Sequence, residues 1–395
     1  AEAAVAWGAQ ALKDAGADTV WLQPVYVPRW VRGKESLQFR AGKSGGYRDI
    51  PVLSLGNSEG TDGRVLEAPV VMVHSFDELD QLPEAAVKGK VVFYNYRFRQ
   101  DFVTTFHGYS DAVKYRSQGP NRASAKGAAA VIIRSVSTAQ DDVPHTGMTA
   151  YADSIRPIPA VAVGNVTADE LEAACKKGAA YIRLQSECRM KEPVLSWNVI
   201  GEIRGAVYPD EIIVAGGHLD SWDVGEGAHD DGAGCVQSIE VIRTFKALNI
   251  HPKRTVRAVL FMNEENGVRG GHAYADSAKA RNERHIFAIE SDAGGFTPRG
   301  IGMHMPEEKK QKIRSYAPLF FDYGVYDFSR DGGGVDIRPL QQQGVPIAGL
   351  IPDSQRYFDL HHAANDTFEA VNHRELKLGA VAIAGLVYLI SEYGL

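Results

Sequence analysis

The pattern of apolar and polar positions predicts alternating strands and helices over much of the chain. Apolar residues at helical spacing predict helices over residues 1–15, 235–247, 270–280 and 374–393. Apolar runs predict strands over residues 196–202, 211–216, 255–262 and 285–289. The run TVRAVLFM at 255–262 is of the kind found in strands that are buried on both faces. This alternation is typical of an α/β domain.

The pattern of predicted elements changes between residues 58 and 189, where short strands are separated by turns. Strands are predicted over residues 70–73, 91–94, 129–134, 158–163 and 181–185, and helices over 123–128 and 167–177. The segments GKVVFYN, AKGAAAVIIRS and IPAVAVGNVTADELE resemble the protease-associated domain, a β-rich module that usually walls a neighbouring active site. A generic α/β insert is the alternative. The predicted organisation is a main domain, 1–57 and 190–395, with an insert over 58–189.

Composition excludes several classes of partner. The length of 395 residues predicts two or three domains. The 44% of hydrophobic residues is enough for a large core. Lys and Arg number 43 against 49 Asp and Glu, a net charge of −6 without long runs of one sign. This balance argues against a nucleic-acid surface and a polybasic membrane anchor. The longest apolar stretch, 378–390, is shorter than the roughly 18 residues of a spanning helix, so a soluble protein is expected.

The cysteines do not predict a thiolate metal site. Cys175, Cys188 and Cys235 have neither an even count nor CxxC spacing, so any metal must be bound by His and carboxylate side chains. A bridge between Cys175 and Cys188 and three unpaired thiols both stay open at this point. The first residues lack the basic region and apolar stretch of a signal peptide, while a start without Met is compatible with a processed chain.

Side chains that commonly bind metals occur in five places, each at or after a predicted strand. They are His218 and Asp220 in GGHLD, Asp230 and Asp231 in AHDDGAG, Glu264 and Glu265 in NEENG, Asp292 in ESDAGG, and His361 and His362 in DLHHAAND. Ligands of open α/β sheets bind at the carboxyl ends of the strands. These side chains are therefore candidates for one site.

The residue types and spacings suggest how such a site is built. His218 and Asp220 are two apart on a strand, so one can bind a metal while the other orients it. Adjacent Glu264 and Glu265 repel one another and are costly to bury without cations. Because neighbouring side chains diverge, one glutamate can bind metal while the other faces the attacking water. Of the aspartate pair, Asp231 suits a helix N-cap and Asp230 suits a bridge between two ions.

The order His, Asp, Glu-Glu, Asp, His, together with GGHLDSWD, resembles the co-catalytic zinc aminopeptidases and glutamate carboxypeptidases. The likeness covers essentially the whole chain and implies a zinc-peptidase fold, a mixed central sheet flanked by helices. It also implies two Zn²⁺ ions and a role for each residue. By resemblance, His218 and Asp292 bind one ion, Glu265 and His362 bind the other, Asp230 bridges them, Glu264 is the general base and Asp220 orients His218.

Two zinc ions in such a site lower the pKa of a bound water towards about 7. Glu264 then accepts the proton of that water, typically a contribution of about 10²–10⁴-fold. The predicted reaction is hydrolysis of dipeptides or short peptides with free termini, without a covalent intermediate. No G-x-S-x-G motif supports a serine hydrolase.

Some assignments remain open. Several relatives have Tyr where this chain has His361, which either donates a hydrogen bond to the oxyanion or only packs. The Gly-rich segment 330–336 resembles a substrate-pocket loop, and Trp222 and Asp223 could line the same pocket. Alternative functions are an amidohydrolase acting on N-acyl amino acids and a receptor-like scaffold without catalysis. Manganese or cobalt would fit the same ligands. The resemblance further implies a homodimer and a secreted or periplasmic location.

Overall fold

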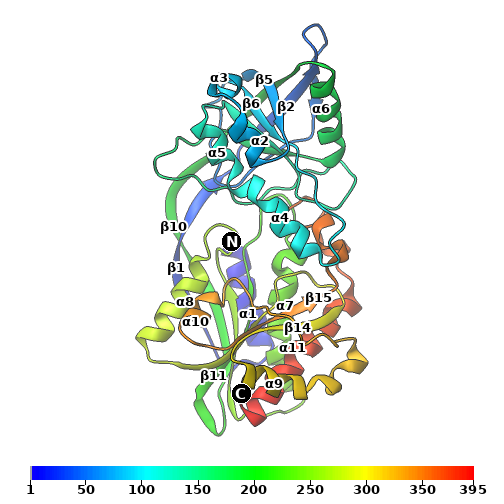
Figure 1. Ribbon diagram of the computed structural model, residues 1–395. Helices are drawn as coiled ribbons and strands as arrows, with labels where there is room; N and C mark the ends of the chain where they lie inside the picture. The colour runs from blue at the N-terminus through cyan, green and yellow to red at the C-terminus, as the bar shows by residue number, and fades with distance from the viewer. Residues whose placement is uncertain (1) are drawn as a thin grey trace. The chain divides into compact units, whose positions relative to one another are not determined.

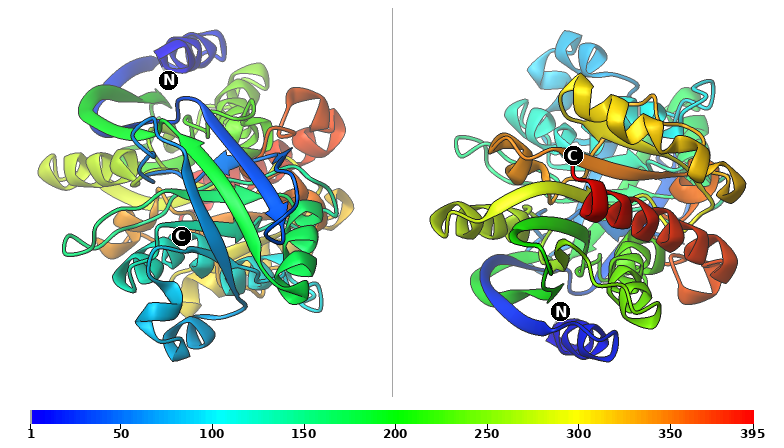
Figure 2. Two further views of the ribbon diagram at one scale, coloured as in Figure 1. Left: turned by 90° about the horizontal axis from the view of Figure 1, so that it is seen from above. Right: turned by 90° about the horizontal axis from the view of Figure 1, so that it is seen from below.

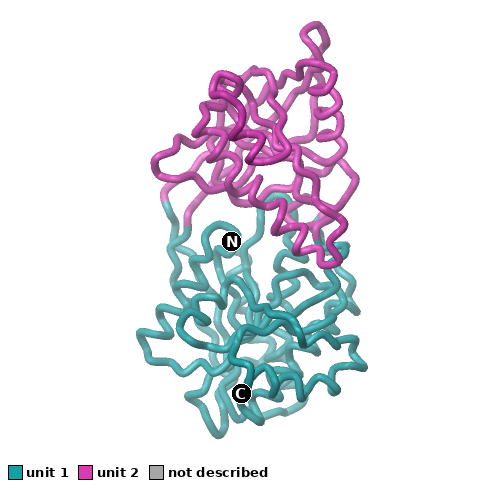
Figure 3. The backbone as a smooth tube through the Cα atoms, in the orientation of Figure 1, with its two compact units in different colours: residues 1–27, 193–357, 366–395 teal, residues 28–192, 358–365 magenta. Residues whose placement is uncertain are grey.

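The computed structural model describes residues 2–395, which divide into two compact units (Figure 3). Unit 1 comprises the chain up to residue 27 together with 193–357 and 366–395. Unit 2 comprises residues 28–192 and 358–365. The candidate residues from His218 to Asp292 therefore belong to unit 1, whereas His361 and His362 belong to unit 2.

Unit 1 is built on a mixed seven-stranded sheet (Figure 1). In spatial order its strands are β1 (Thr19–Val31), β10 (Arg189–Ile203), β12 (Arg254–Phe261), β11 (Tyr208–His218), β13 (Arg284–Glu290), β15 (Ile347–Pro352) and β14 (Pro298–His304). β11 runs parallel to β12 and β13, and β13 runs parallel to β15. The pairs β10–β12 and β14–β15 are antiparallel. The predicted mixed central sheet is confirmed.

Helices cover this sheet. They are α1 (Glu2–Asp14), α7 (Ala233–Ala247), α8 (Arg269–Ala280), α9 (Glu307–Ser315), α10 (Arg338–Gln342) and α11 (His373–Tyr393). Short helical turns occupy Ala228–Gly232, Ala317–Leu319, Phe321–Tyr323, Ser354–Asp359 and Phe368–Ala370. Within residues 2–395 only α11 is long and apolar enough to cross a membrane, judged by length and composition. It lies beside α7 (Figure 2, right), and Leu386, Val387 and Ile390 are fully buried in the core.

Unit 2 contains an eight-stranded sheet. In spatial order its strands are β3 (Arg48–Ile50), β2 (Glu35–Ala41), β9 (Ala180–Ser186), β5 (Leu66–Val73), β6 (Val91–Tyr94), β7 (Ala130–Arg134), β8 (Ala160–Val163) and β4 (Leu53–Ser54). Its helices are α2 (Phe76–Gln81), α3 (Glu84–Val87), α4 (Thr105–Ser117), α5 (Gly119–Ala125) and α6 (Asn165–Lys177). The parallel strands β6, β7 and β8 are buried along their whole length, as their apolar sequences predict.

The units divide at different residues from the boundary predicted at 57/58. β2 pairs with β9 over residues 35–41 and 180–186, so the segment that contains β2 folds with unit 2 (Figure 2, left). Residues 358–365 also join unit 2. Cys175, Cys188 and Cys235 are all free thiols, and the alternative of a Cys175–Cys188 bridge is wrong.

Candidate metal centre

The ends of three neighbouring parallel strands bring candidate metal ligands to one edge of the sheet of unit 1. β11 ends at His218, β12 leads into Glu264 and Glu265, and β13 leads into Asp292. Parallel strands present their carboxyl ends at a common edge, where ligands of α/β proteins bind. Asp230 follows in the turn before α7. The strands therefore gather side chains that lie far apart in the sequence.

His218 is the centre of this arrangement. Its Nδ1 lies 2.8 Å from the backbone carbonyl of Asp220 and donates a hydrogen bond to it. A neutral ring in this tautomer carries a lone pair on Nε2. That Nε2 lies 3.2 Å from Oδ1 of Asp230 and 3.4 Å from Oδ1 of Asp292. A buried acceptor nitrogen facing two carboxylates is the donor set that a divalent cation such as Zn²⁺ requires.

The pKa shifts reflect the same crowding of negative charge. Burial alone would lower the pKa of His218, but Asp230 and Asp292 raise it well above its ordinary value. Burial raises the pKa of Glu264 well above its ordinary value, and the charges of Asp292 and Glu265 add to the shift. Burial likewise raises the pKa of Asp231. A bound cation would favour the ionised carboxylates, so the residues present fit a metal ion.

Asp220 holds the loop after β12. Its Oδ1 accepts hydrogen bonds from the backbone amides of Asn263 at 2.5 Å and Glu264 at 3.1 Å. The same oxygen lies 3.9 Å from Nδ1 of His218, beyond hydrogen-bond distance. The backbone carbonyl of Asp220 orients His218, and its carboxylate positions the glutamate pair instead.

Asp231 and Asp366 fix the turn that carries Asp230. Asp231 accepts from the amide of Gly234 at 2.9 Å near the start of α7, the capping role expected from the sequence, and from the amide of His218 at 3.0 Å. The peptide bond between Asp230 and Asp231 is cis. Asp366 accepts from the amides of His229 at 2.8 Å and Asp230 at 3.1 Å. Sequence reasoning missed Asp366, although it lies in the quoted segment with the histidine pair.

His229 was also missed, although it directly precedes Asp230. Its Nδ1 accepts from the amide of Gly295 at 3.0 Å, and its Nε2 lies 3.3 Å from the carbonyl of Ala370. The ring stacks on Phe296 with centroids 4.2 Å apart. Burial lowers the pKa of His229, so the ring is neutral at neutral pH. This side chain joins the turn of Asp230 to the loop that follows Asp292.

The Gly-rich segment 330–336 packs against the sheet. Glu290, at the end of β13, accepts from the amides of Val335 at 2.8 Å and Ile337 at 3.0 Å. A Cβ added at Gly334 would lie 2.1 Å from the carboxyl carbon of Glu290. The glycine at this position is therefore explained by close packing on Glu290. Trp222 is buried, and Asp223 is exposed.

Tyr357 is a further residue that sequence reasoning missed. Its side chain is buried, and burial together with the charges of Asp230 and Asp292 raises the pKa of its hydroxyl well above the ordinary value. The hydroxyl therefore stays protonated and can donate a hydrogen bond. The sequence feature that could have identified Tyr357 is its position in YFDLHH, four residues before His361.

His361 and His362 are positioned by unit 2. Their rings stack with centroids 3.6 Å apart, and His361 meets Tyr109 edge-on at 5.2 Å. Nδ1 of His362 lies 3.2 Å from the carbonyl of Thr146. When Nδ1 donates to that carbonyl, the lone pair is on Nε2, which can then bind a metal. The aromatic contacts of His361 agree with a packing role and leave a donor role open.

Comparisons with known proteins agree with this arrangement. The sequence pattern of Peptidase family M28 matches residues 198–387. Carboxypeptidase Q from Homo sapiens is 34% identical over 384 residues, which cover 97% of this chain and 79% of that protein. The crystal structure of a peptidase M28 precursor from Shewanella amazonensis SB2B is 32% identical, with a TM-score of 0.92 over 99% of this chain and 88% of that one. A zinc aminopeptidase from Bacillus subtilis shares the fold at 20% identity, with a TM-score of 0.69 over 98% of this chain and 88% of that one.

Proposed function

The chain belongs to peptidase family M28 and is a zinc-dependent exopeptidase, and on this premise we propose that it hydrolyses dipeptides or short peptides with free termini, with Glu264 as general base. One observation carries the proposal. Oxygens of Asp230 and Asp292 face Nε2 of His218 at 3.2 and 3.4 Å, so one imidazole nitrogen and two carboxylates form a donor set that suits a divalent cation.

We assign two Zn²⁺ ions to the five ligands that the sequence pattern supplies. His218 and Asp292 hold the first ion, Glu265 and His362 hold the second, and Asp230 bridges them. The contacts of His218 within unit 1 support its half of this assignment. The contact between Nδ1 of His362 and the carbonyl of Thr146 is compatible with the other half, because an Nδ1 that donates to this carbonyl leaves the lone pair for a metal on Nε2. When bound, the ions polarise the scissile carbonyl and lower the pKa of a water.

Glu264 performs the proton transfers. Its side chain is half-buried, and burial with the neighbouring carboxylates raises its pKa, a shift that favours uptake of a proton. The carboxylate accepts the proton of the attacking water and passes it to the leaving amine. Asp220 keeps Glu264 in place through its bonds to the amides of residues 263 and 264.

Hydrogen-bond donation to the developing oxyanion is assigned to His361. The proposal rests on the position of His361 beside His362, whose ring it stacks on at 3.6 Å. Oxyanion donors act on charge that exists only in the transition state, so His361 would raise kcat rather than substrate affinity.

Three further assignments rest on sequence resemblance. We propose that the insert, predicted over residues 58–189, is a protease-associated domain, that the protein forms a homodimer, and that it is secreted or periplasmic. Each has its own check: structural superposition on that module, light scattering, and fractionation of cells. None of these outcomes bears on the chemistry of the metal centre.

The test of function compares metal-free with zinc-loaded protein on a panel of dipeptides and their N-acetylated forms. Zinc-loaded protein is expected to bind about two ions per chain and to release amino acids from the free dipeptides, and chelation should abolish the release. Faster hydrolysis of the N-acetylated forms would favour the amidohydrolase alternative. Full activity in protein that elemental analysis shows to be metal-free would refute the mechanism.

A further inference from the structure

The loop 263–269, which carries the glutamate pair, is closed at both ends by one buried side chain. Asn198, on β10, is fully buried. Its Oδ1 accepts a hydrogen bond from the backbone amide of Met262 at 2.9 Å, and its Nδ2 donates to the carbonyl of Gly270 at 2.9 Å. The backbone amide of Gly270 also donates to the carbonyl of Met262 at 2.8 Å. The side chain of Asn198 therefore bonds both the residue before the loop and the residue after it.

The amide group of Asn198 is held in one orientation. Its Nδ2 also donates to Oε1 of Gln23, on β1, at 2.8 Å, so the side chain donates twice and accepts once. Turning the amide over would place its oxygen against two other oxygens. A Cβ added at Gly270 would lie 2.3 Å from Oδ1 of Asn198, so only glycine allows this close approach.

The loop has backbone conformations that need support from outside. Asn263, Gly267 and Val268 have positive φ values of 72°, 134° and 55°. The left-handed region is unfavourable for a β-branched residue such as Val268, and it persists only where surrounding contacts hold it. Asp220 bonds the first amides of the loop, and Asn198 bonds the residues at its two ends. These contacts hold the loop in its conformation.

We propose that Asn198 is a positioning residue that keeps Glu264 and Glu265 in place for proton transfer and metal binding. It acts through the backbone at the two ends of the loop. A misplacement of about 1 Å can lower the rate of a reaction between positioned groups by about 100-fold. This inference rests on the proposed function and extends it by naming a residue that determines the geometry of the general base.

The proposal predicts different effects on the two zinc ions. Glu265 is assigned to one ion and lies on the loop that Asn198 closes. His218 and Asp292, assigned to the other ion, follow β11 and β13 and lie outside this loop. Loss of the Asn198 side chain should therefore weaken binding of one ion and spare the other. A residue that only stabilises the fold would not separate the two ions.

The test compares Asn198→Leu, which has a similar volume and makes none of the three hydrogen bonds, with the control Thr255→Val. Thr255 is also buried and lies at the opposite end of β12 from the loop. Its hydroxyl donates to the carbonyl of Pro209 at 2.7 Å and accepts from the amide of Gly205 at 3.1 Å. Both variants are expected to melt below the wild type, but Thr255→Val should keep the wild-type kcat and both zinc affinities.

Asn198→Leu should lower kcat of the zinc-loaded protein by about 10- to 100-fold, with KM changed less than about twofold, because the buried amide of Met262 loses its acceptor. Titration of metal-free protein with zinc against a competing chelator should show one ion weakened by a similar factor. Gln23→Leu removes one of the three hydrogen bonds and leaves both ends of the loop in contact with Asn198. It should weaken the same ion, and lower kcat, by about 2- to 10-fold.

The Gln23 variant keeps the test decisive if Asn198→Leu does not fold. Values of kcat and of both zinc affinities that match Thr255→Val would overturn the proposal and leave Asn198 with a stabilising role alone. Equal weakening of both ions would overturn it as well. If wild-type protein binds zinc but cleaves no peptide, the proposed function has failed, while the unequal loss of the two ions still tests the position of Glu265.

Discussion

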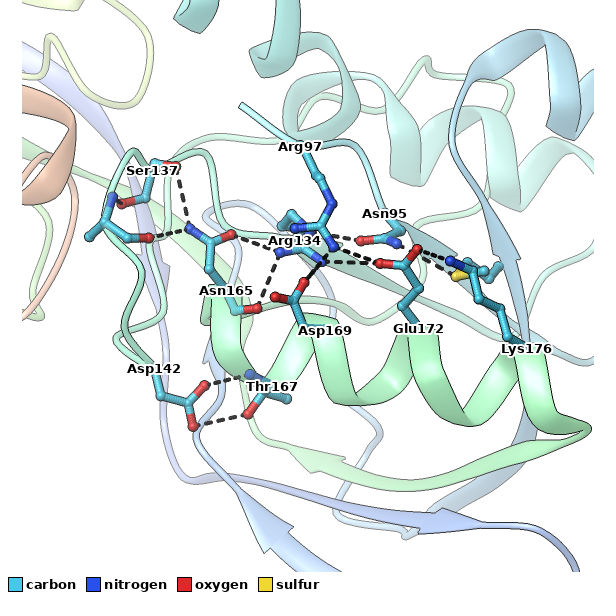
Figure 4. Close-up of polar contacts among 12 residues, drawn as sticks. Asn95, Arg97, Arg134, Ser137, Asp142, Asn165, Thr167, Asp169, Glu172 and Lys176 are labelled. Carbon is cyan, nitrogen blue, oxygen red and sulfur yellow. Dashed lines mark hydrogen bonds and ion pairs between the residues drawn. The ribbon is translucent and has the colours of Figure 1, made fainter. Parts of the chain in front are cut away.

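The metal centre of unit 1 and the polar network of unit 2 are both clusters of charged side chains around a buried residue, His218 in unit 1 and Arg134 in unit 2, yet they balance charge in opposite ways. In unit 2, Arg134 is only 1% exposed in its side chain and donates to Asn95 at 2.7 Å, to Asn165 at 3.2 Å and to Asp169 at 2.5 Å (Figure 4). Asp169 and Glu172 project from α6 towards Arg134 and Arg97 (Figure 4). Both arginines of this network therefore contact acidic side chains.

In unit 1 the acids converge on one another. His218 faces Asp230 and Asp292, and the charges of Asp292, Glu265 and Asp230 all raise the pKa of Glu264. The difference distinguishes polar groups that stabilise the fold from polar groups that bind a ligand. A network whose charges are matched stabilises the fold, whereas a cluster of like charges is stable only with a ligand of opposite sign.

The largest effect is expected from the metal centre. Glu264→Gln removes the general base and should lower kcat by about 10²–10⁴-fold at unchanged zinc content. Because the substitution also removes one of several crowded acids, the melting temperature of metal-free protein should stay constant or rise. Steady-state kinetics, elemental analysis and thermal unfolding check these outcomes. A kcat within tenfold of the wild type would remove Glu264 from the mechanism.

Substitutions in the polar network around Arg134 in unit 2 should lower stability and leave catalysis unchanged. Arg134→Met removes a buried guanidinium that contacts Asp169 and Glu172, and it leaves the buried oxygens of Asn95 and Asn165 without their donor. It should lower the free energy of unfolding by about 1–3 kcal/mol, the usual cost of leaving a buried polar group unsatisfied. Arg97→Met is the control, because Arg97 contacts the same two acids at 2.7 Å but is 55% exposed, and it should cost at most about 1 kcal/mol. Denaturant titration measures both values, and kcat per folded molecule should not change. Equal losses in the two variants would contradict the distinction.

The features of the fold and of the metal centre that could be predicted from the sequence are those that depend on neighbouring residues. Apolar runs such as 255–262 identified strands buried on both faces, and the polar residues after them marked the edge of the sheet where His218, Glu264 and Asp292 lie. β14 and β15 were not predicted, because both contain glycine and short apolar runs that lack a clear strand pattern.

Long-range contacts were beyond such reasoning. β2 belongs to unit 2 only because it pairs with β9, more than a hundred residues later. His229 and Asp366 act through hydrogen bonds to loops that are distant in sequence, so neither residue type nor local spacing distinguishes them. The same limit applied to Asp220, whose role depends on which backbone amides its carboxylate meets.

A smaller effect separates packing from catalysis at His361. Phenylalanine keeps an aromatic ring against His362 and Tyr109 but donates no hydrogen bond. If His361 acts on the oxyanion, His361→Phe should lower kcat by about 10- to 100-fold with KM nearly constant, because a hydrogen bond to a charged group contributes about 1.5–3 kcal/mol. His361→Ala should lower kcat equally and also reduce thermal stability. A parental kcat in the Phe variant would leave His361 with the packing role alone.

The smallest effect concerns Glu172, at the edge of the matched network. Lys176 and Arg97 lower the pKa of Glu172 from 4.5 to about 2. Since the folded state favours the ionised form, this contribution to stability is complete above pH 4.5 and is lost as the pH falls towards 2. Glu172→Gln should therefore melt a few degrees below the wild type at pH 7, and the gap should close between pH 4.5 and 2. Glu192→Gln, an exposed glutamate of unit 2, is the control. A gap that stays constant over this range would show that the ionised form of Glu172 does not stabilise the network.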